Sequence, residues 1–287
     1  MVLVVAGSDS GGGAGVQGDI KTLSALGVFA TTAVTAITAQ NTMGVSAVVA
    51  LDDSVVSAQI QAVCSDMRPG WTKTGMLASA PNVEVVATLA AEGLLGNLVV
   101  DPVLAASTGR SLGGQAVGEA IVRHLVRHAT VFTPNAQEAA VMLGGDIRSI
   151  PDMAEAARAF GALGAAWVVV KGGDLLEGPG AREAIDVIWD GREIQMLRSP
   201  RVFSNNTHGS GCAFASAIAA GLAKAQPPWD AISFAKAYVS KAIEAAAGWQ
   251  LGEGKGPLDH FGWSPKDPGL QLGRAEMGST GQSQPGR

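Results

Sequence analysis

The sequence predicts an α/β layered fold in which helices cover both faces of a mostly parallel central sheet with an antiparallel edge. Short β-branched runs alternate along the chain with segments of helical periodicity, as in layered α/β proteins. Hydrophobic residues make up 47% of the 287 residues and charged residues 16%, enough for a large buried core. The 38 glycines indicate many tight turns between strands and helices. No linker rich in proline, serine or charge divides the chain, so we expect one domain.

The expected strands are continuous apolar runs, typical of strands that are covered on both faces. They are Val2–Ala6, Thr31–Thr38, Val45–Ala50, Leu98–Asp101 and Trp167–Lys171. A further pair, Ala184–Trp189 and Glu193–Leu197, flanks Asp190-Gly191, a dipeptide suited to a two-residue hairpin turn. This pair predicts the antiparallel edge.

Helical spacing of apolar residues lies between these runs, with Gly27 and Gly164 placed as carboxyl-terminal stops. The expected helices are Val16–Leu26, Asp53–Met67, Pro81–Leu94, Gln115–His128, Ala136–Leu143, Pro151–Leu163, Gly211–Ala225 and Trp229–Ala247. The chain loses periodicity after residue 263. We therefore expect a domain over residues 1–263 and a disordered tail over 264–287.

Charge and cysteine content exclude several classes of protein. The net charge is -5 and no run of lysine or arginine occurs, which argues against a nucleic-acid partner. The longest apolar stretches, such as Ala213–Ala223, are shorter than the ~20 residues that cross a bilayer, so we expect no membrane role. Cys64 and Cys212 cannot form a disulfide framework, and no secretory segment precedes the first strand, so we expect a cytoplasmic protein with Cys64 in the core.

A first glycine cluster, Gly7–Asp19, contains G-x-G-x-x-G over Gly13–Gly18. A dinucleotide fingerprint requires an acidic residue about 20 positions further on, at the end of the second strand. Here that strand ends in Thr38-Ala39-Gln40, which argues against such a site. Two interpretations remain: glycines that serve turn geometry alone, or a ligand-binding loop beyond a strand end. If the loop binds a ligand, Asp9, Gln17 and Asp19 are candidates for contacts with a small molecule.

A second glycine cluster opens an apolar helix within Asn206–Leu222. Backbone N–H groups at such a helix start can bind an anion, and the helix dipole is expected to lower the pKa of the Cys212 thiol. No Walker phosphate loop, G-x-x-x-x-G-K-[ST], occurs in the chain. Lys171 ends a buried strand before two glycines; it is either a solvated strand end or a phosphate contact.

Two acidic residues occupy comparable positions. Asp101 ends a strand before a proline, and Glu138 lies in the first turn of a predicted helix, so each alone has a local explanation. Together with Lys171 and the Cys212 loop they predict a magnesium-phosphate site. His124 and His128 have no third ligand nearby and are expected on an exposed face, whereas His208 either shapes the anion loop or takes part in chemistry.

Seven motifs follow one another along the chain. They are A-G-S-D-S-G-G-G-A-G-V-Q-G-D-I-K-T from Ala6, T-A-Q-N-T from Thr38, T-K-T-G-M-L from Thr72, V-V-D-P-V from Val99, T-P-N-A-Q-E-A from Thr133, V-V-K-G-G from Val169 and N-T-H-G-S-G-C from Asn206. Taken in order, they resemble the hydroxymethylpyrimidine and phosphomethylpyrimidine kinases of thiamine biosynthesis, in the ribokinase-like superfamily. The resemblance runs from Val2 to about Trp263 and implies a three-layer α/β/α sandwich that phosphorylates the pyrimidine alcohol and then its monophosphate with ATP.

The resemblance also implies roles for individual residues. Substrate contacts are implied for Gln40, Asp19, Gly11 and Met76, with the amide of Gln40 suited to an aminopyrimidine. Magnesium is implied at Asp101 and Glu138, and ATP at Asn135, Lys171 and Ser210, the last being commonly threonine in the family. The catalytic group would be Gly209, Gly211, Cys212 and Lys171. Sugar-directed relatives carry an aspartate where this chain has Cys212, which makes the thiol a candidate proton acceptor.

Two alternatives remain open. A pyridoxal-type kinase shares the glycine-cysteine loop, although Gln40 in its A-Q-N-T context favours the pyrimidine. A non-catalytic binding protein on the same fold is disfavoured because it needs no phosphoryl-transfer residues such as Asp101, Glu138, Lys171 and Cys212. The expected partners are the pyrimidine, ATP, Mg²⁺ and a second copy of the chain in a homodimer.

Overall fold

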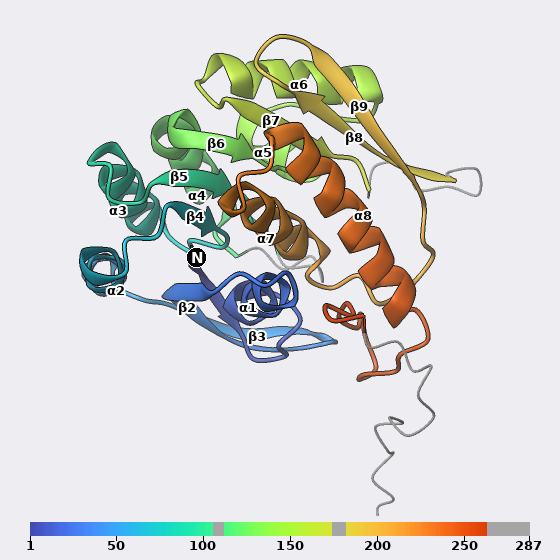
Figure 1. Cartoon of the computed structure of the whole chain (residues 1–287), viewed down its shortest axis with the longest axis horizontal. Helices are drawn as coiled ribbons and strands as arrows, with labels where there is room; N and C mark the ends of the chain where they lie inside the picture. The colour runs from blue at the N-terminus through green and yellow to red at the C-terminus, as the bar shows by residue number, and fades with distance from the viewer. Residues whose placement is uncertain (106–111, 174–181, 263–287) are drawn as a thin grey trace, which may run out of the picture.

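A nine-stranded sheet forms the centre of the computed structural model, which describes residues 1–105, 112–173 and 182–262 (Figure 1). The sheet order is β3-β2-β1-β4-β5-β6-β7-β8-β9. The strands are β1 Val2–Asp9, β2 Ala30–Asn41, β3 Gly44–Ala50, β4 Trp71–Thr74, β5 Asn97–Val100, β6 Ala129–Phe132, β7 Trp167–Lys171, β8 Glu183–Trp189 and β9 Ile194–Pro200. The expected tail, residues 264–287, lies outside the described residues.

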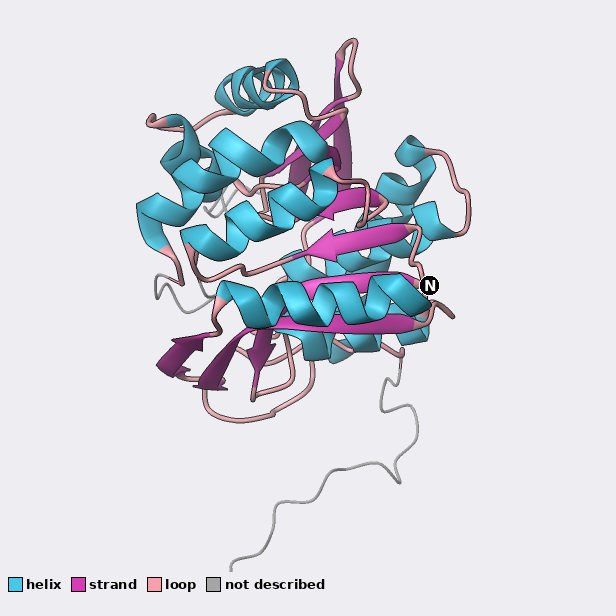
Figure 2. Ribbon diagram, turned by 90° about the vertical axis from the view of Figure 1, so that its left-hand side faces the viewer, coloured by secondary structure: helices cyan, strands magenta, loops and turns pink. Residues whose placement is uncertain are grey.

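Both faces of the sheet are covered by helices, as the continuous apolar runs predicted (Figure 2). In β1, Val2 and Val4 pack on one face while Leu3 and Val5 pack on the other, because side chains alternate along a strand. One layer contains α1 Gly15–Ala25, α7 Ser210–Ala223 and α8 Pro228–Ala246. The other contains α2 Asp53–Asp66, α3 Ala80–Ala91, α4 Gly114–Ala120, α5 Ala136–Leu143 and α6 Ile150–Ala162.

The predicted α/β fold is confirmed, with several differences at the level of elements. The short strands β4 and β6 were missed; β4 contains Lys73, which interrupts an apolar run. The helix expected over Gln115–His128 is α4 followed by a π-helical turn, Ile121–Leu125, and a 3₁₀ turn, Val126–His128. The predicted glycine stops hold, because Gly27 and Gly164 both have positive φ.

Antiparallel strands occur at both edges of the sheet rather than at one. β8 and β9 form the predicted hairpin, but Trp189 pairs with Ile194, so the connection has four residues and not two. Asp190 Oδ1 fixes this longer turn by accepting the backbone N–H groups of Arg192 and Glu193. At the opposite edge, β3 pairs antiparallel with β2, which the sequence did not indicate.

The strand order positions the functional site. β1 pairs in parallel with β2 on one side and with β4 on the other, so the direction of winding reverses at β1. Ligands of α/β sheets bind beyond the carboxyl ends of the strands at such a point. Among the described residues, no helix is long and apolar enough to cross a membrane.

Candidate active site

A cavity of about 770 Å³ opens at the carboxyl edge of the sheet. One end lies beyond β1, β2 and β4 and is lined by Ser8, Gln40 and Met76. The other end lies against β8, β9 and α8 and is lined by residues such as Asp186 and Ile243. The start of α7 and the ends of β5 and β7 lie between them. The cavity is therefore long enough to have two chemically different ends around one helix start.

The first end combines an apolar wall with an amide. Met76 is 7% exposed and clusters with Ala36, Val45 and Leu112, all of which are buried. Gln40 is only partly buried and lines the cavity beside this wall. A flat ring with polar edge atoms matches such a surface, since the methionine packs on the ring and the amide both donates and accepts.

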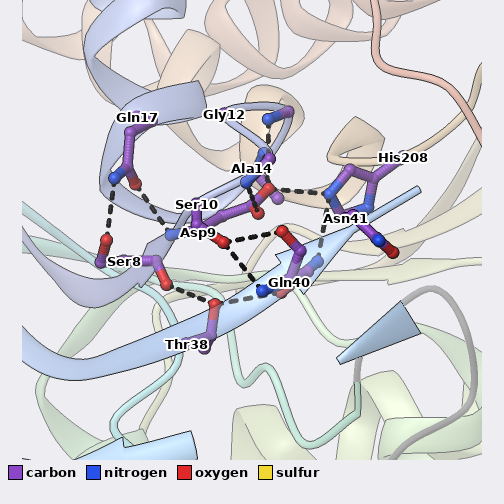
Figure 3. A network of polar contacts seen from close by, with 12 residues as sticks. Ser8, Asp9, Ser10, Gly12, Ala14, Gln17, Thr38, Gln40, Asn41 and His208 are labelled. Atoms are coloured by element: carbon purple, nitrogen blue, oxygen red, sulfur yellow. Dashed lines mark hydrogen bonds and ion pairs between the residues drawn. The ribbon is translucent and has the colours of Figure 1, made fainter. Parts of the chain in front are cut away.

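A network of hydrogen bonds around Asp9 holds this end of the cavity (Figure 3). Asp9 Oδ1 accepts the N–H of Gly11 at 2.8 Å, and Oδ2 accepts those of Gly13 at 3.1 Å and Ala14 at 2.8 Å. His208 Nε2 lies 2.8 Å from the same Oδ2. Burial alone would raise the pKa of Asp9, but the hydrogen bonds and charge that face it bring the pKa below its ordinary value. Asp9 is therefore an ionised anchor for the loop.

The two glycine clusters of the sequence pack against each other. Gly209 has φ +85°, and a Cβ there would lie 1.9 Å from the carbonyl oxygen of Gly13. Gly15 has φ +56°, and its Cβ would lie 2.4 Å from the carbonyl oxygen of Gly7. At Gly13 and Gly18 a Cβ would lie 2.6 Å from His208 Cδ2 and 2.9 Å from the Gly13 carbonyl oxygen. Close packing therefore accounts for all three glycines of the G-x-G-x-x-G pattern without a dinucleotide.

The start of α7 presents backbone N–H groups to the cavity. Gly209 caps the helix, no side chain caps it, and Ser210, Gly211 and Cys212 of the first turn line the cavity. The first N–H groups of a helix have no intrahelical partner and carry the positive end of the dipole. The loop predicted to bind an anion therefore lies at a helix start that lines the middle of the cavity.

Lys171 and Asp101 form an ion pair directly beside this helix start. Lys171 Nζ lies 2.8 Å from Asp101 Oδ1, which also accepts the Thr133 hydroxyl at 3.2 Å. A Cβ at Gly211 would lie 3.3 Å from Lys171 Nζ, so the ammonium lies close against the first turn of α7. Burial alone would lower the pKa of Lys171, but Asp101 and Glu138 raise it above its ordinary value. Lys171 is thus a permanent positive charge on the cavity wall and not a solvated strand end.

Glu138 and Asn135 form a reciprocal cap on α5. Asn135 Oδ1 accepts the N–H of Glu138 at 2.7 Å, and Glu138 Oε2 accepts the N–H of Asn135 at 2.8 Å. Burial raises the pKa of Glu138 to about 7, with Asp101 adding to the rise and Lys171 opposing it. Both residues also line the cavity, so the same two side chains cap α5 and form part of the site.

The expected low thiol pKa of Cys212 is wrong. Burial raises its pKa to about 12, and the positive charge of Lys73 and the N–H of Gly15 only partly offset this. The loss of hydration is the largest cause, and the negative charges of Asp19 and Asp101 add to the rise. Cys212 is therefore a neutral thiol on the cavity wall. Cys64 is 4% exposed within the core, as predicted.

Two of the predicted substrate contacts do not line the cavity. Asp19 is fully buried beneath it, where both carboxylate oxygens accept from Lys73 Nζ at 2.8 and 2.9 Å and Oδ1 accepts from Ser216 at 2.7 Å. Gly11 is exposed on the outer side of the Asp9 loop. The other predicted residues are brought together on the cavity wall; they are Gln40, Met76, Asp101, Asn135, Glu138, Lys171, Gly209, Ser210, Gly211 and Cys212.

Several charged groups in and beneath the site were not predicted from the sequence. Lys73 lay unnoticed in the quoted T-K-T-G-M-L motif. Asp186 and Lys236 line the second end of the cavity and pair at 2.7 Å, with Asp186 also accepting the N–H of Gly172 at 3.1 Å. Arg201 lines the same end. The sequence held two signals for the pair of Asp186 and Lys236. Asp186 interrupts an apolar strand, and Lys236 lies on the apolar face of a helix.

Transfer of a phosphoryl group needs what this cavity brings together: an anion-binding helix start, a fixed positive charge and room for two reactants. The fold and the site therefore define a small-molecule kinase of the ribokinase-like class. Residues 9–259 match the model of the phosphomethylpyrimidine kinase family. The chain belongs to this family.

Similar proteins and structures agree with this assignment. A hydroxymethylpyrimidine/phosphomethylpyrimidine kinase of Streptomyces coelicolor is 45% identical over 92% of this chain and 95% of its own length. The chain spans about half of two longer relatives, bifunctional thiamine biosynthesis proteins of Arabidopsis thaliana and Geobacter sulfurreducens, at 51% and 52% of their lengths.

Among solved structures, a Staphylococcus aureus pyridoxal kinase in complex with AMP-PCP and pyridoxal gives a TM-score of 0.82 at 33% identity, covering 92% of this chain and 95% of its own. A phosphomethylpyrimidine kinase of Clostridium difficile gives 0.73 at 33% identity, covering 84% and 98%.

Proposed function

We propose that this protein transfers the γ-phosphoryl group of ATP to the hydroxyl of hydroxymethylpyrimidine, and then a second phosphoryl group to the phosphate of the product. The observation that carries the proposal is the cavity with two different ends. Gln40 and Met76 at one end suit a pyrimidine ring, and the start of α7 with Lys171 suits the phosphate in transit. The same residues would serve both steps, because the second acceptor is a phosphate oxygen of the monophosphate, which is carried by the same pyrimidine.

We propose that the nucleotide binds at the second end of the cavity. Lys236, Val239, Ser240 and Ile243 lie three or four residues apart on one face of α8 and line it together. The apolar members suit an adenine ring, and Lys236 and Arg201 bring positive charge toward the phosphates. AMP-PCP and ADP were bound in the solved structures of similar kinases, which supports a nucleotide as the second reactant.

The carboxylate groups between the two ends of the cavity fit Mg²⁺. Asp101 Oδ2 is buried and has no hydrogen-bond partner, and Glu138 supplies a second carboxylate on the same wall. In the described part of the chain, no group of three metal-ligating side chains is close enough to hold a metal ion alone. This matches magnesium, which keeps several waters and binds through one or two carboxylates and substrate phosphates. When bound, the ion would neutralise negative charge on the phosphates.

The roles of the remaining residues follow from their positions. The N–H groups of Gly211 and Cys212 would bind the oxygens of the transferring phosphoryl group, and Lys171 would stabilise its charge. Asn135 and Ser210 would contact ATP phosphates from either side. Cys212 could take the substrate proton only as a thiolate, which at pH 8 is about one molecule in ten thousand for a pKa of about 12.

The activity is tested by ³¹P NMR of the products formed from hydroxymethylpyrimidine and Mg-ATP. Formation of the monophosphate followed by the diphosphate supports the proposal, and the matched control Lys171→Met should form neither at a comparable rate. Pyridoxal is the second candidate substrate because a pyridoxal kinase gives the TM-score of 0.82. A higher kcat/KM for pyridoxal than for the pyrimidine would favour that kinase, and no ATP turnover with either would favour a binding protein.

We also propose a homodimer in a reducing compartment such as the cytoplasm. Ile37 and Val49 form a cross-strand pair on β2 and β3 and are 49% and 61% exposed, and Met43 between these strands is 65% exposed. A second copy would bury this apolar edge. Two free cysteines suit a reducing compartment. Analytical ultracentrifugation of the chain and of Val49→Lys tests the dimer: a monomeric wild type would refute it.

A further inference from the structure

We propose that His208 is a positioning residue that fixes the orientation of the Gln40 amide, so that the site accepts an aminopyrimidine edge and rejects a pyrimidinone edge. The inference rests on the proposed function for its substrate, and on the network of Figure 3 for its geometry. His208 immediately precedes Gly209, so the same histidine also ties substrate recognition to the start of α7.

Asp9 decides which ring nitrogen of His208 carries a hydrogen. Its carboxylate receives three backbone N–H groups, and its pKa lies below the ordinary value, so it only accepts. His208 Nε2, at 2.8 Å from Oδ2, must therefore donate. His208 is 7% exposed, and a Cβ at Gly13 would lie 2.6 Å from its Cδ2, so the ring is held closely in place.

The protonated Nε2 in turn decides how the Gln40 amide is turned. The amide end drawn as Nε2 lies 3.2 Å from His208 Nε2, and the end drawn as Oε1 lies 3.4 Å from Thr38 Oγ1. The two ends of an amide are alike in shape, so the hydrogens around them decide the assignment. An amide nitrogen facing Nε2–H would place two donors together. A half-turn of the amide removes this conflict, so we assign the oxygen of Gln40 to the end that faces His208 and the nitrogen to the end that faces Thr38.

Thr38 independently requires the same orientation. Its hydroxyl hydrogen is donated to the carbonyl oxygen of Ser8 at 2.8 Å, so Oγ1 is left as an acceptor toward Gln40. The amide nitrogen satisfies that acceptor. The backbone of Gln40 is also held, because Ser10 Oγ donates to its carbonyl oxygen at 2.7 Å and accepts its N–H at 2.8 Å.

A fixed amide offers its donor and its acceptor to the cavity in one order. An aminopyrimidine edge has a ring nitrogen that accepts beside an amino group that donates, whereas a pyrimidinone edge has a ring N–H that donates beside a carbonyl that accepts. A freely rotating amide could match either edge. With His208 opposing rotation, the pyrimidinone would leave buried polar groups unpaired, which discriminates strongly.

The protonation of His208 is tested directly by long-range ¹H–¹⁵N correlation on protein labelled with ¹⁵N-histidine. The chain has four histidines, so His208→Gln assigns the signals of residue 208. A protonated Nε2 supports the proposal, and an Nε2 that carries no hydrogen would overturn it. Neither result depends on which substrate the enzyme uses, so a failure of the proposed function is distinguishable.

The selectivity is tested by the ratio of kcat/KM for hydroxymethylpyrimidine to that for its deaminated pyrimidinone analogue. His208→Leu should lower the ratio about tenfold or more, because the amide can then rotate. His208→Gln keeps an N–H donor near the Nε2 position and should restore most of it. His124→Leu, outside the cavity, is the matched control. An unchanged ratio in His208→Leu, or equal losses in Leu and Gln variants, would overturn the proposal.

Discussion

Lys73→Met should be among the most damaging single substitutions outside the cavity wall. Lys73 and Asp19 are both fully buried, with Nζ 2.8 and 2.9 Å from the two carboxylate oxygens. Without the ammonium, the Asp19 carboxylate keeps only the Ser216 hydroxyl at 2.7 Å and the charge is left buried and unpaired. Breaking a buried pair in this way costs about 3–5 kcal/mol in the free energy of unfolding.

The double variant Asp19→Asn/Lys73→Met separates charge from shape. It removes both charges while an amide can still accept from Ser216, so we expect it to recover about 2 kcal/mol or more of the single variant's loss. Urea unfolding at pH 7.5, followed by far-UV circular dichroism, measures both, with the exposed Lys241→Met as control. A single-variant loss below about 1 kcal/mol, or a double variant no more stable than Lys73→Met, would refute the reasoning.

Three further outcomes are expected. The pKa of Glu138 is raised from 4.5 to about 7, so its protonated form stabilises the fold below pH 4.5, and this contribution of about 3 kcal/mol is lost as the pH rises through 7. Glu138→Gln should remove this part of the pH dependence of unfolding, and an identical pH dependence in both proteins would contradict the prediction. Gly209→Ala, whose Cβ would meet the Gly13 carbonyl, should abolish turnover or folding, and a variant with wild-type melting and activity would show that the loops can separate. If Cys212 acts as a thiolate base, log kcat should rise by one per pH unit between 7 and 10; a flat profile together with full activity of Cys212→Ser would leave the thiol without a role in proton transfer.

Hydrophobic periodicity and the types of residue at strand and helix ends predicted most of the fold and many of the residues that line the cavity. The alternation of apolar strands and helices placed both helical layers, and glycine clusters after strand ends placed the cavity loops. The short strands β4 and β6 were missed, and in β4 the buried Lys73 interrupts the continuous apolar run that marked the predicted strands. The second antiparallel edge escaped because pairing direction between β2 and β3 is set by contacts that no local pattern contains.

The type of a residue indicated which chemistry its side chain could perform, but it did not indicate whether that side chain is buried. Asp19 and Gln17 looked alike in the sequence as polar residues of a glycine loop. In the structure Gln17 donates to Ser8 and accepts the N–H of Asp9, whereas Asp19 faces Lys73 beneath the cavity floor. The difference lies in which face of α1 each residue occupies against β4 and α7, which depends on packing between segments distant in the chain.

By itself the sequence determined a layered α/β kinase with Gln40, Asp101, Glu138, Lys171 and the Cys212 loop at the carboxyl edge of its sheet, because strand direction brings those positions to one edge. Only the tertiary structure determined the pKa values and the hydrogen-bond partners of these residues. It turned the expected reactive thiol into a neutral one, raised the pKa of Glu138, and linked Asp9 to Gln40 through a histidine 168 residues away from Gln40. Protonation and hydrogen-bond direction depend on burial and on neighbours in space, and these exist only once the chain has folded.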